Sequence, residues 1–405
     1  MQVLDESISS ESLTSEQIHA ALDQLLDHRD PDVSGTVLGA GSDDLDAGRQ
    51  FLQSLFDGGW MVPSWPTQYG GRNADTGEAT RIANALADYE VADLYPYGVG
   101  LNLVGPVLLD RGSVEQQDQW LRSIADGSEI WCQMFSEPDA GSDLANAGMR
   151  ADREREDWIL TGSKVWTSRG AYARWGMCLA RTDTAVPKHR GLTMFAIDMM
   201  SSGVEVRPLE QINGDRHFTE VFVSGARVPD AYRIGELGDG WSLTVEMLAH
   251  ERSTIGGRAF GGGDDGDQGL PSWLEEWRAN GCLSEPVARQ RAIRALILYR
   301  VNQLTVARNA ATLSASGAPG PEGSGAKLRS VAAFKARAYL GKDLAGAAGM
   351  LSGEGHLQFL TAPSMSIRGG TDEVQRNIVA ERILGLPTEP RVDKDTAYAD
   401  LKKSR

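Results

Sequence analysis

The strongest constraint on the fold is a change of sequence pattern near residue 129 and a second change near residue 235. Between these points, short apolar runs such as Trp158-Ile159-Leu160 and residues 218–223 alternate with turn residues. Runs of this length and spacing are typical of strands in an antiparallel sheet. On both sides, apolar residues recur every three or four positions, which is typical of helices. We therefore expect an α+β chain that is helical, then β, then helical.

The helices can be placed from their ends and their periodicity. Thr14 is expected to cap a first helix that carries Ile18 and Leu22 on one side. Further helices are expected at roughly 45–58, 75–92, 98–111, 114–126, 241–258, 285–315, 327–350 and 371–384. The predicted domains are 1–127 (helical), 128–235 (antiparallel β) and 236–390 (helical), followed by a polar tail at 391–405.

Composition excludes several classes of protein. Among the 405 residues, 40 Lys and Arg face 56 Asp and Glu, and no basic stripe with interleaved aromatics is present, so nucleic acid is not an expected partner. Cys132, Cys178 and Cys282 are too few and too scattered for a disulfide framework or a metal site, so we expect buried thiols and no metal. The N-terminus lacks the features of a secretion signal, and no apolar run reaches bilayer length. We expect a cytoplasmic protein without a membrane span.

Two segments of the predicted sheet are candidates for binding a planar ligand. The first, at residues 131–143, reads W-C-Q-M-F-S-E-P-D-A-G-S-D and passes from a strand into a turn of small residues. Such a turn presents backbone N–H groups and hydroxyls at close range. The second, Lys164 to Ser168, places Trp166 before two hydroxyls. Either segment alone fits an ordinary strand end, but together they favour a planar heterocycle such as a flavin.

Motifs along nearly the whole chain resemble those of the acyl-CoA dehydrogenases. The matching pieces, in order, are W-P-T-Q-Y-G-G at 65–71, F-S-E-P-D-A-G-S-D at 135–143, W-T-S at 166–168, G-L-T-M-F-A-I-D at 191–198, G-D-G-W at 238–241, H-E-R at 250–252 and G-G-T-D-E-V-Q-R-N-I-V-A-E-R-I-L-G-L-P at 369–387. The resemblance implies an N-terminal helical domain, a middle β-domain and a C-terminal four-helix bundle. This order agrees with the pattern of the sequence.

The resemblance also implies a cofactor, a reaction and partners. It implies tightly bound FAD, an acyl-CoA substrate that loses its α-proton and β-hydride, an electron-transfer flavoprotein or similar acceptor, and a homo- or heterotetramer or a dimer. The positions that match cofactor-binding sites are Gln133, Phe135, Ser136, Gly141, Ser142, Trp166, Thr167, Ser168, Thr371 and Glu373. The positions that match substrate-binding sites are Ser142, Arg252, Gly369 and Gly370.

The catalytic base departs from the commonest pattern of the family. Many members carry it as a glutamate directly before the final Gly-Thr, where this chain has Gly369. A subset that includes isovaleryl-CoA dehydrogenase carries it on a helix, just before an arginine. That position is Glu251 in His250-Glu251-Arg252, so we predict Glu251 as the base and a structural role for His250. The alternative is that Glu251 is an ordinary, ion-paired helical glutamate.

A second departure concerns the grip on the FAD pyrophosphate. The family's R-x-x-F-G segment, through which a neighbouring subunit reaches the FAD, is absent from residues 260–285, and Gly261 to Gly269 is expected to be a loop. Arg289, Arg291 or Arg294 could substitute, and the spacing does not choose among them. This departure favours one alternative, a non-catalytic partner subunit of a heteromeric dehydrogenase. An acyl-CoA oxidase or flavin hydroxylase of the same fold is a further alternative, which no sequence feature specifically supports.

Two glycines are the only sequence feature that bears on the size of the acyl group. Gly256 and Gly257 follow Glu251 by about one helical turn and would leave open space beside an acyl chain. A branched or bulky acyl group, from fatty acid or steroid degradation, is therefore preferred over a long straight one.

Overall fold

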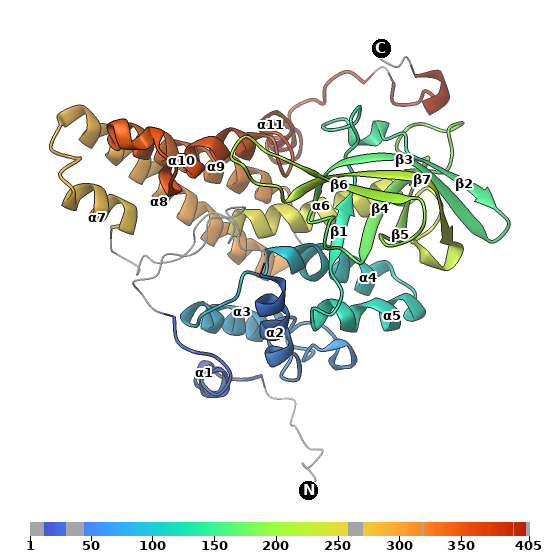
Figure 1. Ribbon diagram of the computed structural model, residues 1–405, viewed down its shortest axis with the longest axis horizontal. Coiled ribbons are helices and arrows are strands. Elements are labelled where there is room, and N and C mark those ends of the chain that lie inside the picture. The colour runs from blue at the N-terminus through green and yellow to red at the C-terminus, as the bar shows by residue number, and fades with distance from the viewer. Residues whose placement is uncertain (1–11, 30–43, 258–269, 317–319, 392, 402–405) are drawn as a thin grey trace, which may run out of the picture.

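A computed structural model describes residues 12–29, 44–257, 270–316, 320–391 and 393–401; within these ranges the side chains of residues 251–257 and 313–316 are not described. Figure 1 shows a sheet flanked by two groups of helices, with the N-terminal helices on one side and the C-terminal helices alongside α6 (Gly240–Gly257). The predicted order, helical then β then helical, is confirmed.

In its described residues, the N-terminal part has five α-helices and short connecting turns. They are α1 (Ser15–Leu22), α2 (Leu45–Phe56), α3 (Thr76–Ala85), α4 (Gly105–Arg111) and α5 (Val114–Ala125). Thr14 caps α1 as predicted, and Gln17 returns a hydrogen bond to complete a capping box. The helix expected at 98–111 is divided, because a π-helical turn at Gly100–Val104 precedes α4, whose first turn contains Pro106.

The central sheet has the order β6-β7-β3-β2-β4-β5-β8, and β1 pairs with β4 beside this path. Its strands are β1 (Trp131–Met134), β2 (Arg150–Glu154), β3 (Asp157–Ser168), β4 (Trp175–Arg181), β5 (Leu192–Asp198), β6 (Val204–Leu209), β7 (Phe218–Pro229) and β8 (Arg233–Ile234). Most neighbours are antiparallel, as expected, but β1 runs parallel to β4, and β2 meets β4 in parallel at one residue pair. In both cases at least one other strand separates the two partners in the chain, as parallel neighbours require, because a tight hairpin joins only antiparallel strands.

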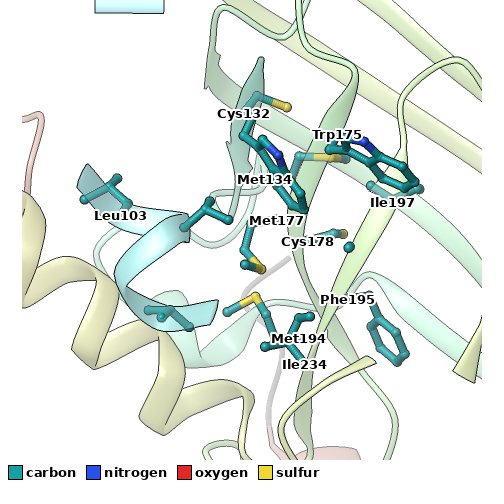
Figure 2. Packing of buried hydrophobic residues seen from close by; sticks show 14 of the residues in the cluster. Leu103, Cys132, Met134, Trp175, Met177, Cys178, Met194, Phe195, Ile197 and Ile234 are labelled. Atoms are coloured by element: carbon teal, nitrogen blue, oxygen red, sulfur yellow. The ribbon is translucent and has the colours of Figure 1, made fainter. Parts of the chain in front are cut away.

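One large core joins the sheet to the N-terminal helices. The ring of Trp120 from α5 lies 5.5 Å from Trp131 of β1 and 5.4 Å from Trp175 of β4. Figure 2 shows side chains from β1, β4 and β5 packing together beside Leu103 of the N-terminal part. Burial on both faces explains why β4 and β5 read as continuous apolar runs.

The cysteines follow the expectation in two cases out of three. Cys132 and Cys178 are buried in this core, and burial raises the pKa of the Cys178 thiol to about 11. Cys282 is only half-buried, so the expectation was wrong for this residue, which lies beyond the core in the helical part.

The C-terminal helices pack around α9 (Glu322–Leu344). Its neighbours are α6, α8 (Pro286–Ser316), α10 (Glu354–Thr361) and α11 (Asp372–Ile378). Two helices were not predicted: α10, and α7 (Ser272–Ala279), which packs Leu274 against Leu340 of α9. In the described part of the chain, no helix combines the length and apolarity that crossing a membrane requires.

The end of the chain returns to the sheet. The backbone of Tyr398 donates a hydrogen bond to the carbonyl of Val186 at 2.9 Å, and its ring lies 3.6 Å from the Arg181 guanidinium carbon. Tyr398 is 7% exposed. The segment predicted as a polar tail therefore contains a buried aromatic anchor.

Candidate active site

A cleft of about 2680 Å³ opens where the three parts of the chain meet. Tyr95 of the N-terminal part, Phe135 beyond β1, Trp241 of α6 and Gly369 before α11 all line it. Most of the sequence-predicted site residues therefore share one cavity although they are far apart in the chain. The predicted residues that line it are Gln133, Phe135, Ser136, Gly141, Ser142, Trp166, Ser168, Gly369, Gly370 and Thr371.

The turn that carries Ser136 is fixed by a buried ion pair. The Lys164 ammonium donates to Oε1 of Glu137 at 2.8 Å and to the carbonyl of Phe135 at 3.0 Å. Glu137 also accepts hydrogen bonds from the backbone N–H groups of Gly148 and Met149. The Glu137 carboxylate is thus engaged by Lys164 and by two backbone N–H groups, which supports a structural role in this turn.

A bulge in β3 presents Trp166 to the cleft. The pairing of β3 with β7 shifts register between Lys164 and Thr167, and Trp166 adopts a φ of 61°. A bulge of this kind redirects a side chain. The Trp166 ring is 55% exposed and lies 5.8 Å from the Phe218 ring in an edge-to-face arrangement.

Thr167 faces the opposite side of the same strand. It is fully buried, does not line the cleft, and its Oγ1 has no hydrogen-bond partner within the described residues. A direct contact from its side chain to a cofactor in the cleft is therefore not supported, because successive strand residues point to opposite faces. Ser168, one residue later, lines the cleft.

The segment Gly369-Gly370-Thr371, directly before α11, forms part of the wall of the cleft. Both glycines have a positive φ, 64° and 81°, which favours glycine at these positions. Gln375 stabilises the turn, because its Nε2 donates to the carbonyl of Gly369 at 2.9 Å. Thr371 caps α11 through the N–H of Val374 at 3.2 Å.

Glu373 does not line the cleft, contrary to the expected cofactor contact. Its side chain is 77% exposed and forms an ion pair with Arg376 at 3.3 Å. The first turn of a helix favours an acidic residue, which accounts for a glutamate at this position without a ligand.

Helix α6 forms another wall of the cleft, with Trp241, Val245 and Leu248 along it. Glu251 and Arg252 belong to the same helix, but their side chains lie outside the described residues. Burial lowers the pKa of the preceding His250, and the charge of Asp110 partly opposes this effect. The imidazole is therefore neutral at pH 7, in keeping with a structural role.

Sequence reasoning missed an ion-pair bridge among the residues that line the cleft. The Lys188 ammonium lies 3.0 Å from Asp143 and 2.7 Å from Asp393, so it joins the turn after Ser142 to the C-terminal segment. Burial acts to lower the pKa of Lys188, but the two carboxylates outweigh it and raise the pKa. No signal in the sequence pairs residues 143, 188 and 393, because they approach only in three dimensions.

The donor set of the cleft fits a flavin. Trp166 offers a flat apolar surface, while Ser136 and Ser168 offer hydroxyls on the same cavity. At Gly141 a Cβ would meet no atom within 4 Å, so the turn borders open space that a ligand can enter. Within the described residues, no group of three or more His, Cys, Asp or Glu side chains has a metal-binding arrangement.

Comparisons with known proteins agree with this geometry. The acyl-CoA dehydrogenase N-terminal, middle and C-terminal domain families match residues 40–128, 132–224 and 238–384. Acyl-CoA dehydrogenase FadE34 of Mycobacterium tuberculosis is 38% identical over 339 residues, which are 82% of this chain and 46% of that protein. Acyl-CoA dehydrogenase IpdE1 of the same organism is 32% identical over 354 residues, which are 85% of this chain and 89% of that protein.

A solved structure, described as the Tcur3481-Tcur3483 steroid ACAD, is 25% identical with a TM-score of 0.74, and the match covers 93% of this chain and 97% of that one. The chain spans about half the length of FadE34 and most of the length of IpdE1. The three domain matches, the IpdE1 relationship and the shared fold lead to one conclusion: the chain belongs to the acyl-CoA dehydrogenase family, whose members depend on FAD.

Proposed function

We propose that the protein catalyses the FAD-dependent α,β-dehydrogenation of an acyl-CoA thioester. One observation carries this proposal: Trp166 and Ser168 from the sheet share a cleft with the Gly369-Gly370 turn and with the face of α6 that leads to Glu251. These residues come from separate domains, so their convergence is a property of the fold rather than of one motif.

The proposed chemistry assigns a proton transfer to Glu251. An α-proton next to a thioester can be removed when a positioned carboxylate is withdrawn from water and the thioester oxygen is stabilised as negative charge develops. Backbone N–H groups in the Gly369-Gly370 turn are suitable donors to that oxygen. A bound FAD would supply the acceptor for the β-hydride, at its N5 position. Trp166, Ser136 and Ser168 would hold its ring, with Gln133, Phe135 and Gly141 beside it, and Ser142 and Arg252 would contact the substrate.

The variant Glu251→Gln tests this assignment. It should retain bound FAD, measured by flavin absorbance, and lose the bleaching that acyl-CoA produces in the parent protein. Glu246→Gln is the matched control, because Glu246 lies on the same helix, does not line the cleft and is 3.5 Å from Arg111. Undiminished bleaching in Glu251→Gln would refute the role of Glu251 as base.

The proposed substrate is a branched or bulky acyl group. Two observations favour this choice. The similar solved structure is described as a steroid ACAD, and the pair Gly256-Gly257 follows Glu251. Rates of flavin bleaching should be compared for straight-chain, branched and steroid-derived CoA esters. A preference for long straight chains would contradict the proposal.

The electron acceptor distinguishes a dehydrogenase from an oxidase. A dehydrogenase should transfer electrons to an electron-transfer flavoprotein, whereas an oxidase should form peroxide.

An exposed apolar face on α8 favours assembly with another chain of this family. Five aliphatic residues between positions 287 and 304 are more than one-third exposed: Val287, Ile293, Ile297, Val301 and Leu304. A contiguous face of this kind is typical of protein–protein contact. The name Tcur3481-Tcur3483 joins two chains, and a heterotetramer or homotetramer is the proposed assembly.

A non-catalytic partner role is the second candidate function. The flavin absorbance of the chain purified alone distinguishes it from a catalytic role.

A further inference from the structure

Arg368 is a cleft residue to which the proposed chemistry gives no role. It directly precedes the Gly369-Gly370 turn and lines both the main cleft and a small adjoining cavity of about 40 Å³. Its side chain is partly buried, and burial lowers the pKa of the guanidinium, with Tyr95 and Asp215 acting in the opposite direction. The group stays charged at neutral pH, since an arginine begins far above that range.

The guanidinium has little to bind within the protein. Its Nε donates to the Met365 sulfur at 3.1 Å, a weak acceptor. Among the described residues, none accepts a hydrogen bond from its two Nη atoms, and none forms an ion pair with it. A partly buried arginine with this few acceptors is costly unless a ligand supplies them.

The carboxylate whose charge acts on Arg368 is already engaged with His217. Asp215 Oδ2 lies 2.6 Å from Nδ1 of His217, and its Oδ1 accepts the backbone N–H of the same histidine. His217 is 4% exposed, so this pair is enclosed. Asp215 therefore influences Arg368 through its charge but does not complete its hydrogen bonds.

A second buried arginine, Arg169, lies close to the same Asp215–His217 pair, because its backbone N–H donates to the carbonyl of His217. Arg169 is 4% exposed and lies over the Tyr95 ring at 4.7 Å, on the same side of the cleft as the Asp215–His217 pair. Arg368 therefore keeps open Nη donors in a region where the carboxylate that acts on it is already bound to His217. This arrangement favours a ligand that brings acceptor oxygens.

We propose that Arg368 determines specificity by binding an acceptor oxygen, of a ketone or a carboxylate, on the acyl group beyond its β-carbon. The proposal rests on the proposed acyl-CoA function and names the chemistry of its substrate. Arg368 adjoins the turn assigned to the thioester, so the oxygen lies only a few carbons from that group. A site built to hydrogen-bond an oxygen discriminates strongly against an analogue that lacks it, because its own donors are then left unpaired.

Equilibrium binding to the FAD-loaded Glu251→Gln protein tests the proposal without turnover. Three CoA esters of matched shape differ only at the fifth carbon: 5-methylhexanoyl-CoA, 5-oxohexanoyl-CoA and glutaryl-CoA. Calorimetry should show that at least one oxygen-bearing ester binds about 10- to 100-fold more tightly than the hydrocarbon, the range expected for charge-assisted hydrogen bonds. Adding Arg368→Met should bring that ratio close to one, and Arg368→Lys should give an intermediate ratio.

Arg376→Met is the matched control, because Arg376 is exposed, lies outside the cleft and pairs only with Glu373 among the described residues. It should leave the ratio unchanged. Equal binding of all three esters to the Glu251→Gln protein would overturn the proposal whatever the Arg368 variants do, and so would a ratio that survives Arg368→Met. The proposed function fails separately, if no CoA ester of any class bleaches the flavin of the parent protein.

Discussion

The middle sheet and the C-terminal helices treat their apolar residues in opposite ways. Strands β4 and β5 are buried almost from end to end within this chain. Helix α8, in contrast, leaves Ile297 56% exposed and Leu304 72% exposed at helical spacing. The sheet is covered by other parts of the same chain, among them the N-terminal helices, whereas α8 presents a face that a second chain can cover. The same division runs through the active site, since the predicted flavin contacts lie mainly on the sheet side and the predicted base lies on α6.

The largest expected effect on stability comes from breaking the buried ion pair between Lys164 and Glu137, which supports the turn that carries Ser136. Lys164 is fully buried and Glu137 is 11% exposed in its side chain. Lys164→Met leaves the carboxylate without its cation, which should lower the free energy of unfolding by about 3–5 kcal/mol, measured by urea denaturation. The double variant Lys164→Met/Glu137→Gln should lose less, because no unpaired charge is left behind. A single variant as stable as the parent would show that the pair does not support the sheet.

The exposed face of α8 gives the next largest effect. Leu304→Asp should weaken assembly by about 1.5–3 kcal/mol, the value of burying one leucine, and shift the mass measured by light scattering toward the monomer. Val114→Asp is the control, because Val114 is 65% exposed on α5 in a different domain. If both variants keep the parent mass, the α8 face is not the interface.

A smaller effect is expected from Asp230, which follows β7 and should make the free energy of unfolding depend on pH in the acid range. Hydrogen bonds from Arg233 and Trp158, together with the charge of Arg153, lower the pKa of Asp230 to about 2. Because the folded-state pKa is lowered, the stabilisation is complete above the unfolded-state value near 3.8 and is lost as the pH falls towards 2. Unfolding free energies of the parent and Asp230→Asn should differ by about 1–2 kcal/mol at pH 6. The difference should shrink as the pH falls from 3.8 through 2 and vanish only below that folded-state pKa; a difference that stays constant across this range would contradict the assignment.

Trp166 should have the smallest effect on stability and a clear effect on the cofactor. Its ring is more than half exposed, so Trp166→Ala should change the free energy of unfolding by less than about 0.5 kcal/mol. Bound FAD should show an altered absorbance spectrum and weaker retention. Tyr172→Ala, at a 44% exposed aromatic outside the cleft, should change neither property. An unaltered flavin spectrum in Trp166→Ala would remove this ring from the cofactor site.

Local signals in the sequence were accurate where the relevant interactions are close along the chain. The Thr14 cap, the bounds of α2 and α5, and the apolar strands of the sheet follow from residues a few positions apart. The short helices α7 and α10 were missed because their apolar residues make few repeats, and packing against α9 stabilises them. The burial of Tyr398 was missed for a related reason, since its partners lie around residues 146, 181 and 186.

The sequence by itself determined the order of the domains, the family and the residue types that suit a flavin and a thioester. Only the tertiary structure decided which of these residues meet. The bulge in β3 turns Trp166 to the cleft and Thr167 away from it, and Glu373 lies outside. It also placed Arg368 at the cleft with few acceptors of its own. The physical reason is that burial and hydrogen-bond satisfaction depend on neighbours in space, which the linear order of residues does not specify.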